Sequence, residues 1–218
     1  MLLESVAWLG HSGFRIAVGK STLYIDPYRI GQDEPKADLV LITHQHYDHF
    51  SPQDLERIRK PGTAVIAPPA VAERLEGSVT SVRPGEVVET HVPGVDVRAI
   101  PAYNTSKRDA EGRPFHPREA GYVGYEVGIR GERLYHAGDT DVIPEMDWVV
   151  GADVALLPVS GVYVMTAAEA AEAARRIQPS VAVPMHWGEH IGSEEDAQAF
   201  AEAAPVEVAI LESAGAAA

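Results

Sequence analysis

The 218-residue chain is 45% hydrophobic and 23% charged, an ordinary composition for a globular protein that can bury a sizeable core. Its formal net charge of −14 and sequence pI of about 5.0 argue against a nucleic-acid partner, because an acidic surface repels phosphate backbones. The chain has no cysteine, which excludes disulfides and thiolate metal sites, so any metal must bind histidine, aspartate or glutamate.

The first third of the chain is rich in short β-type runs. They cover residues 6–9, 14–18 and 22–25 and are separated by glycines. Residues 38–43 form a continuous apolar run, which predicts a strand that is buried on both faces. Ser51 and Pro52 predict a helix that ends near Arg59, with serine as its cap and proline at its first position. A strand over residues 63–67, a short helix over 69–75 and three short strands between 79 and 100 follow.

A long polar segment divides the chain. Residues 101–121 are rich in proline and show no periodicity, and a loop of that length inside a compact domain is usually functional or disordered. Strands resume over residues 122–129 and 133–136, and a turn follows at 137–141. After a buried strand at 154–157, Thr166 and Glu169 form a capping box that opens a helix to residue 177. A strand at 181–184, a helix at 193–203 and a strand at 206–211 close the chain. With no repeat and no linker, we expect one domain, residues 1–218, with two sheets covered by helices.

Three histidines and an aspartate crowd into the segment 41–50, LITHQHYDHF, directly after the buried strand at 38–43. Ligands of α/β proteins usually bind at the carboxyl ends of strands, where these side chains stand. His44 and His46 alternate along an extended segment and point the same way, whereas Asp48 and His49 follow a bend and can face a second point. One loop could therefore offer two ligands to each of two metal ions. The alternative is a polar loop with incidental histidines, which the H-x-H-x-D-H spacing disfavours.

The H-x-H-x-D-H pattern after a buried strand resembles the metallo-β-lactamase superfamily. WLGHSGF (residues 8–14) and YIDPY (residues 24–28) resemble the opening of its small single-domain branch. That branch includes metal-dependent hydrolases, ascorbate-6-phosphate lactonases and relatives of N-acyl-phosphatidylethanolamine phosphodiesterases. YHAGDTD (residues 135–141) and VPMHWG (residues 183–188) resemble two further strand ends that carry ligands. The resemblance implies an α/β (α+β) fold of the metallo-β-lactamase type, a four-layer αββα sandwich.

The resemblance also implies two divalent metal ions, zinc first, with manganese, nickel and iron as alternatives. His44 and His46 would bind the first ion, and Asp139 would bridge the two. The second ion would take Asp48, His49 and His186. Taken alone, Asp139 could instead be a turn residue and His186 a structural histidine beside Trp187.

The third protein ligand of the first ion departs from the family pattern. Relatives place a histidine soon after the strand that ends here at Ile100, but this chain has Tyr103 and Asn104. We take His116 in the long loop as the candidate, with no protein ligand as the equal alternative. His91 stands before a turn and is expected to face solvent, and Asn104 would be a poor substitute.

Four further residues near the motifs each have two interpretations. Asp26 could accept a hydrogen bond beneath the histidine loop or simply end a strand before proline, and His11 could border the pocket or belong to a turn. His136 and His190 flank proposed ligands and are taken as bystanders or pocket lining.

The function expected from these residues is hydrolysis. Bound metal lowers the pKa of water to about 7, and the resulting metal-bound hydroxide could attack an ester, lactone, amide or phosphodiester. Asp48 and Asp139 are the candidate catalytic residues, because either could hold the hydroxide and move its proton. Five residues in or near the long loop could bind an anionic substrate, although a solvated polar loop is the better explanation of each one: Tyr103, Asn104, Lys107, Arg108 and Arg118.

Two other functions on the same fold are weighed against hydrolysis. A flavodiiron-like redox protein generally has a carboxylate where His46 stands, and a non-catalytic protein would not keep a complete histidine loop. We expect a small-molecule substrate and leave homo-oligomerisation open. No apolar run reaches the roughly 20 residues of a membrane span, and the first residues do not resemble a signal peptide. The expected location is therefore cytoplasmic.

Overall fold

Two β-sheets face each other in the computed structural model, which describes residues 1–188 and 191–214. The first sheet has the strand order β1-β2-β3-β4-β5-β6 and the second has the order β13-β12-β11-β10-β9-β8-β7. The strands of the first sheet are β1 (Val6–Gly10), β2 (Gly13–Val18), β3 (Ser21–Ile25), β4 (Leu39–Leu41), β5 (Ala64–Ala67) and β6 (Val79–Ser81). Those of the second are β7 (Val87–Glu89), β8 (Val95–Pro101), β9 (Val123–Ile129), β10 (Glu132–His136), β11 (Val154–Pro158), β12 (Val181–Met185) and β13 (Glu207–Val208).

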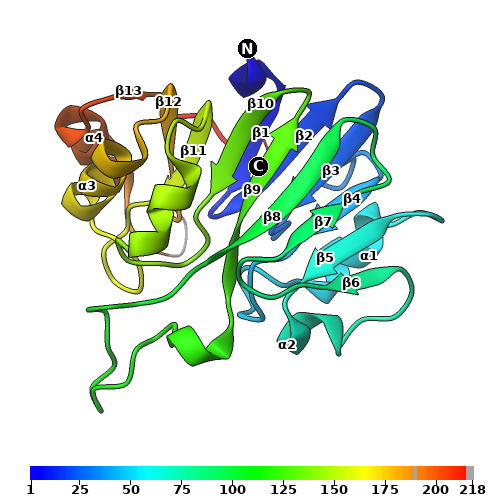
Figure 1. The fold of residues 1–218 in the computed structure, drawn as a ribbon, viewed down its shortest axis with the longest axis horizontal. Coiled ribbons are helices and arrows are strands. Elements are labelled where there is room, and N and C mark those ends of the chain that lie inside the picture. Colours follow the sequence, from blue (N-terminus) through cyan, green and yellow to red (C-terminus); the bar gives the residue numbers. More distant parts are fainter. Residues whose placement is uncertain (189–190, 215–218) are drawn as a thin grey trace.

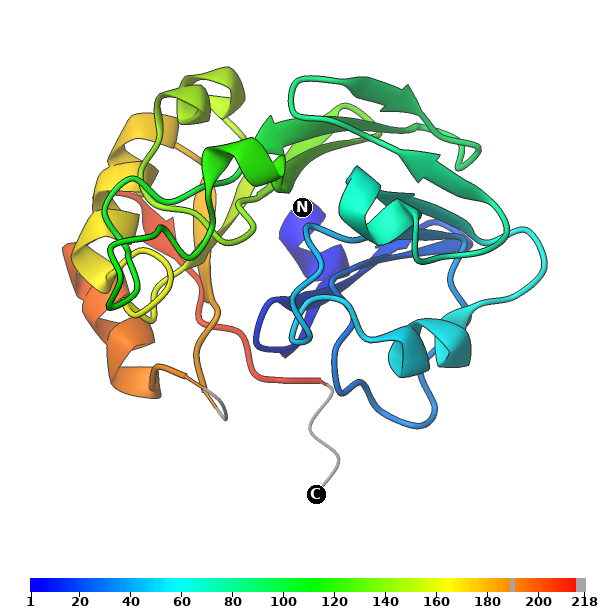
Figure 2. The same cartoon turned by 90° about the horizontal axis from the view of Figure 1, so that it is seen from below.

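Helices lie outside the paired sheets. The α-helices are α1 (Pro52–Ile58), α2 (Pro69–Ala72), α3 (Ala167–Ile177) and α4 (Glu194–Ala203), and the 3₁₀ helices are η1 (Leu2–Ser5), η2 (Arg118–Ala120) and η3 (Pro144–Val149). In Figures 1 and 2, α3 and α4 flank the strands β11 and β12, while α1 and α2 lie beside the first sheet. This is the predicted αββα sandwich.

The burial of β4 shows the layering residue by residue. Leu39 and Leu41 belong to the large core between the sheets, whereas Val40 packs in a second core with Leu55 of α1 and Val71 of α2. Every residue of the strand is therefore buried, as the continuous apolar run predicts.

Local chemistry places the helix starts where the sequence predicts them. The Ser51 hydroxyl accepts the backbone N–H of Asp54 at 3.2 Å at the start of α1. The capping box of Thr166 and Glu169 opens α3. Other bounds differ from expectation: α2 ends at Ala72, β13 pairs over two residues only, and the 3₁₀ helices η1, η2 and η3 were not predicted. Short elements of this kind depend on their neighbours more than on their own propensity.

Strand directions bring the candidate residues to one edge of each sheet. β1, β3 and β4 point the same way, because β1 and β3 are each antiparallel to β2 and β4 is parallel to β3. β8, β10 and β12 also share one direction in the second sheet. The residues that follow the carboxyl ends of these six strands include His11, Asp26, His44, Asn104, Asp139 and His186.

Candidate metal centre

A buried carboxylate forms the base of the centre. Asp26 accepts the backbone N–H of Thr43 at 2.8 Å and the Thr43 hydroxyl at 2.6 Å, and it lies 2.7 Å from Nδ1 of His49. Since the Thr43 hydroxyl gives its proton to Asp26, its oxygen can accept Nδ1–H of His44 at 2.9 Å. Asp26 therefore lies beneath the histidine loop, and this base directs Nε2 of His44 and His49 away from itself.

The first group of potential ligands is His44, His46 and His116. Their ligand atoms lie within 4.8 Å of one another. Nε2 of His44 is 3.0 Å from Nδ1 of His46, and the ring of His116 is centred 5.2 Å and 5.0 Å from those of His44 and His46. The long loop thus carries His116 back to the histidine loop.

Asn104 holds His116 in that position. Its amide oxygen accepts the backbone N–H of His116 at 2.8 Å and lies 3.0 Å from Nδ1 of the ring. Asp141 in turn accepts the Asn104 amide N–H at 3.1 Å and the backbone N–H groups of Thr105 and Ser106, each at 2.7 Å. The two ends of the loop are therefore joined, and Nε2 of His116 is directed toward the cluster.

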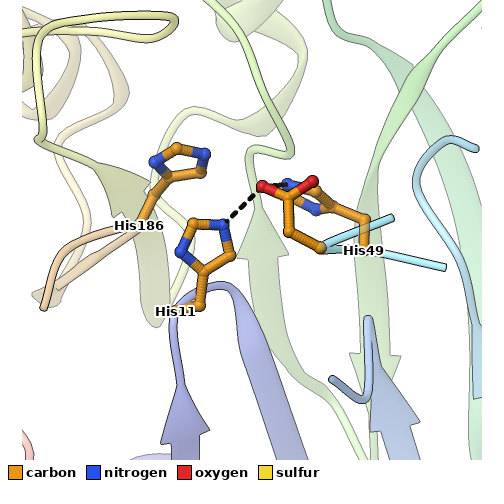
Figure 3. Close-up of side chains that lie close together, drawn as sticks. His11, His49 and His186 are labelled. Atoms are coloured by element: carbon orange, nitrogen blue, oxygen red, sulfur yellow. Dashed lines mark hydrogen bonds and ion pairs between the residues drawn. The ribbon is translucent and has the colours of Figure 1, made fainter. Parts of the chain in front are cut away.

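The second group comprises His11, Asp48, His49 and His186, whose ligand atoms also lie within 4.8 Å of one another. Figure 3 shows the rings of His11, His49 and His186 close together on three separate segments. Nε2 of His11 is 3.0 Å from Oδ2 of Asp48, and Nδ1 of His186 is 2.9 Å from the Ser160 hydroxyl. The backbone carbonyl of His11 accepts the N–H of His186 at 2.9 Å, which ties the first hairpin to the end of β12.

Asp139 lies between the two groups. Its Oδ1 is 3.2 Å from Nε2 of His49, and its Oδ2 is 3.3 Å from Nε2 of His116 and 3.2 Å from Nε2 of His186. The carboxylate is 3% exposed, so solvent hardly competes for these contacts. This position suits a carboxylate that serves both groups.

The donor atoms fit a divalent metal. Nε2 of His49, His116 and His186 and Oδ1 of Asp139 are buried and have no hydrogen-bond partner among the described residues. Buried polar atoms without partners are costly, and cations bound at the two groups would satisfy them. Two ligands at 2.0–2.1 Å from a tetrahedral zinc ion lie about 3.3 Å apart, which matches the separations of 3.2 Å, 3.3 Å and 3.2 Å around Asp139.

Burial favours the neutral form of two imidazoles of the first group, which is the form that binds metal. Burial, together with the charge of His49, holds the pKa of His44 well below its ordinary value, and burial also lowers the pKa of His46. His49 differs: burial opposes its charge, but Asp139 and Asp26 outweigh that effect and raise its pKa well above the ordinary value. A cation between His49 and Asp139 would replace that proton.

The two carboxylates favour their ionised form. Burial opposes ionisation of Asp139, but the charges of His186 and His49 hold its pKa well below the ordinary value. Burial opposes ionisation of Asp48 as well, yet its hydrogen bond with His11 lowers its pKa. Ionised carboxylates beside neutral imidazoles are the ligands that zinc takes in proteins.

A cavity of about 320 Å³ opens onto the cluster. It is lined by His46, Tyr47, Asp48, Phe115, His116, Asp139 and Tyr163. A substrate in this cavity would therefore reach members of both ligand groups and Asp139. Its size is at the lower end of the range for small-molecule pockets.

All seven residues predicted to bind metal lie in this cluster: His44, His46, Asp48, His49, His116, Asp139 and His186. His11 lies beside them, His91 is exposed, and His190 lies outside the described residues. His136 is buried, does not belong to either metal group, and lies 2.9 Å from the carbonyl oxygen of Ser12. Sequence reasoning did not assign the supporting roles of Asn104, Asp141 and Ser160. The sequence contains only a weak indication of these roles. The turn AGDTD at residues 137–141 contains Asp141, but nothing in the sequence shows which groups its carboxylate would accept.

The comparisons with known proteins agree with this geometry. Residues 5–186 match the model of the family described as β-lactamase superfamily domain. A metal-dependent hydrolase of Methanopyrus kandleri is 31% identical, over 95% of this chain and 96% of the relative. A metal-dependent hydrolase of Thermoplasma acidophilum is 34% identical, over 84% of this chain and 82% of the relative.

A crystal structure from Parabacteroides distasonis superimposes with a TM-score of 0.83 at 30% identity, and the match covers 95% of this chain and 93% of that one. Among the described residues, no helix is long and apolar enough to cross a membrane. The match of the family model to most of the chain, the hydrolase relatives and the His/Asp cluster lead to one conclusion: the chain belongs to the metallo-β-lactamase superfamily and is a metal-dependent hydrolase.

Proposed function

We propose that the chain binds two divalent ions, most simply zinc, and hydrolyses an ester, lactone, amide or phosphodiester of a small substrate. His44, His46 and His116 would hold one ion, and Asp48, His49 and His186 would hold the other, with Asp139 shared between them. The observation that carries this proposal is the set of four buried, inward-facing donor atoms that have no hydrogen-bond partner within residues 1–188 and 191–214. On its outer side, each imidazole in that set meets Asp26, Asn104 or Ser160.

When bound, such ions supply Lewis acidity, which activates a water molecule and polarises the bond to be cleaved. The residues of the chain do the rest. Asp48 is 18% exposed and lines the cavity, so it can accept the proton of the nucleophile and return it to the leaving group. The more deeply buried Asp139 would orient the reacting groups.

His11 would act as a positioning residue for Asp48. Its Nε2 is 3.0 Å from Oδ2 of Asp48, while its backbone carbonyl accepts the indole N–H of Trp8 at 2.9 Å. The ring thus stands on a hairpin that is itself hydrogen-bonded, and it can hold the Asp48 carboxylate by donating to Oδ2. Preorganisation of this kind keeps a proton-transfer group within reach of its substrate.

The test is metal content and hydrolysis measured together. We expect chelation to abolish activity against a panel of lactones, esters and phosphodiesters, and zinc to restore both activity and melting temperature. His46→Ala and Asp139→Ala should each lose zinc and activity. His91→Ala is the matched control, because it removes an exposed histidine outside the cluster. Hydrolysis that survives complete metal removal, or full zinc content in Asp139→Ala, would refute the proposal.

A further inference from the structure

The cavity above the candidate metal centre has an aromatic wall. Phe115 and Tyr163 meet edge to face, with ring centroids 4.7 Å apart and ring planes at 82°. Tyr47 lines the cavity with them and is 71% exposed, and Tyr163 is 41% exposed. Large aromatic surfaces left open at a cavity usually mark a site that an apolar group covers.

The aromatic wall and the ligand cluster share one supporting residue, Asn104. The amide N–H of Asn104 donates to the carbonyl of Tyr163 at 2.9 Å, while its amide oxygen holds His116, the neighbour of Phe115. One asparagine therefore holds a proposed metal ligand, which is the residue next to Phe115, and the backbone of Tyr163. A group resting against the wall would stand at a fixed distance from the reacting bond.

Among the residues that the structure describes, no lysine or arginine lines the cavity. The residues outside the described ranges 1–188 and 191–214 include neither type. The candidate anion-binding residues of the long loop have other partners. Lys107 pairs with Glu169 at 2.6 Å, Arg118 pairs with Glu145 at 2.7 Å, and Arg108 donates to the carbonyl of Gly112 at 2.9 Å.

Another cation, Arg29, contacts Tyr28, which lies beside Tyr47. The guanidinium carbon of Arg29 is 5.5 Å from the ring centre of Tyr28, which in turn contacts Tyr47 at 6.1 Å. Arg29 is not among the lining residues. A carboxylate or phosphate on the non-reacting part of a substrate would thus meet aromatic carbon in a protein of net charge −14.

We propose that the non-reacting part of the substrate is uncharged and apolar, preferably an aromatic ring packed against Phe115 and Tyr163. This inference rests on the proposed function and narrows its substrate class. The reacting ester, lactone, amide or phosphodiester group would face the His/Asp cluster, and the apolar arm would extend along the wall. Edge-to-face packing on two rings gives such an arm a defined orientation.

Hydroxamates allow binding at the metal centre and binding at the aromatic wall to be measured separately. The hydroxamate group chelates zinc, and its substituent contacts the wall. Binding of acetohydroxamate, phenylacetohydroxamate and succinate monohydroxamate to the zinc-loaded protein would be measured by calorimetry, which does not depend on turnover. We expect phenylacetohydroxamate to bind at least about tenfold more tightly than acetohydroxamate. Succinate monohydroxamate should bind no more tightly than acetohydroxamate.

Variants locate the effect on the wall. Phe115→Ala and Tyr163→Ala should each reduce the preference for the phenyl arm, with acetohydroxamate as the reference for any change at the metal centre. Trp148→Ala is the matched control, since Trp148 is 40% exposed, like Tyr163, but lies outside the cavity. Tyr163→Lys should move the preference toward the succinate arm by adding a cation to an exposed position.

Two kinds of failure are distinguishable. Tight binding of acetohydroxamate with no gain for the phenyl arm, or with a gain for the succinate arm, overturns the inference and leaves the metal centre intact. An unchanged phenyl preference in both alanine variants overturns it as well. Binding of none of the three hydroxamates overturns the inference together with the proposed function on which it rests.

Discussion

Replacing Asp26 by asparagine tests whether the base of the centre controls metal affinity. The carboxylate is fully buried and serves three groups at 2.6–2.8 Å: the backbone N–H of Thr43, its hydroxyl, and Nδ1 of His49. Asparagine has similar volume and tolerates the positive φ of 44° at this position. It offers one acceptor oxygen and turns an N–H₂ group toward the remaining donors.

The expected loss has two parts. Hydrogen bonds to charged groups contribute about 1.5–3 kcal/mol each, so losing one or two should reduce the free energy of unfolding by about 2–4 kcal/mol. Loss of the outer partner of a ligating histidine lowers metal affinity about 10- to 100-fold, which is about 1.4–2.7 kcal/mol. Denaturant unfolding of the metal-free protein measures the first part, and zinc competition with a chromophoric chelator measures the second.

Asp54→Asn is the matched control for Asp26→Asn. Asp54 is 5% exposed and accepts the N–H of Arg29 at 2.8 Å and the guanidinium of Arg57 at 2.9 Å, away from the histidines. The Asp54→Asn variant should have a lower free energy of unfolding but the same affinity for zinc as the unaltered protein. If Asp26→Asn folds and binds zinc as tightly as the unaltered protein, Asp26 supports the fold alone and its proposed action on His49 is wrong.

Three further predictions follow from the same structure. His116→Ala should weaken one zinc site by more than about 100-fold, since a ligand matters more than its outer partner, and full occupancy of both sites in a metal analysis would contradict this. The metal-free protein should lose about 3 kcal/mol of stability between pH 6.5 and pH 4 from His11 alone, because burial lowers the pKa of that ring from 6.5 to about 4 and the unfolded chain takes up the proton first. The raised pKa of His49 adds no slope in this window, as its contribution is complete below pH 6.5, so a flat denaturation profile would refute the assignment. Gly124→Ala should cost about 3 kcal/mol, because the added Cβ would lie 2.5 Å from the carbonyl oxygen of His136, whereas Gly31→Ala, with no atom nearer than 3.9 Å, should be nearly neutral in the same melting assay.

Features that depend on neighbours in the chain could be predicted from the sequence. The Ser51-Pro52 start of α1 and the capping box of α3 each involve residues only a few positions apart in the sequence. The continuous apolar run of β4 indicates by itself that the strand is buried on both faces. The histidine loop was predictable for the same reason: its residues are contiguous and follow a strand end. Where propensity is weak and pairing is long-range, as in β13, the sequence predicted too long an element.

Asp26 beneath the histidine loop was one of two interpretations of the sequence, but the support from Asn104, Asp141 and Ser160 could not be predicted, because it joins distant residues. Asn104 looked like a poor substitute for a ligand, but it is the residue that orients His116 and connects it to Asp141. Ser160 meets His186 across a connection that includes α3. A single sequence contains no information on which of several polar residues in a long loop will meet, since the answer depends on how the sheets pack.

The candidate centre takes its residues from both sheets. The histidine loop follows β4 of the first sheet, whereas Asp139 and His186 follow β10 and β12 of the second. An ion bound by residues of both sheets would be a removable crosslink, and it would have to dissociate before the sheets could separate. Such a crosslink acts mainly on the barrier to unfolding, so scarcity of metal would shorten the lifetime of the folded chain before it changed the folded shape.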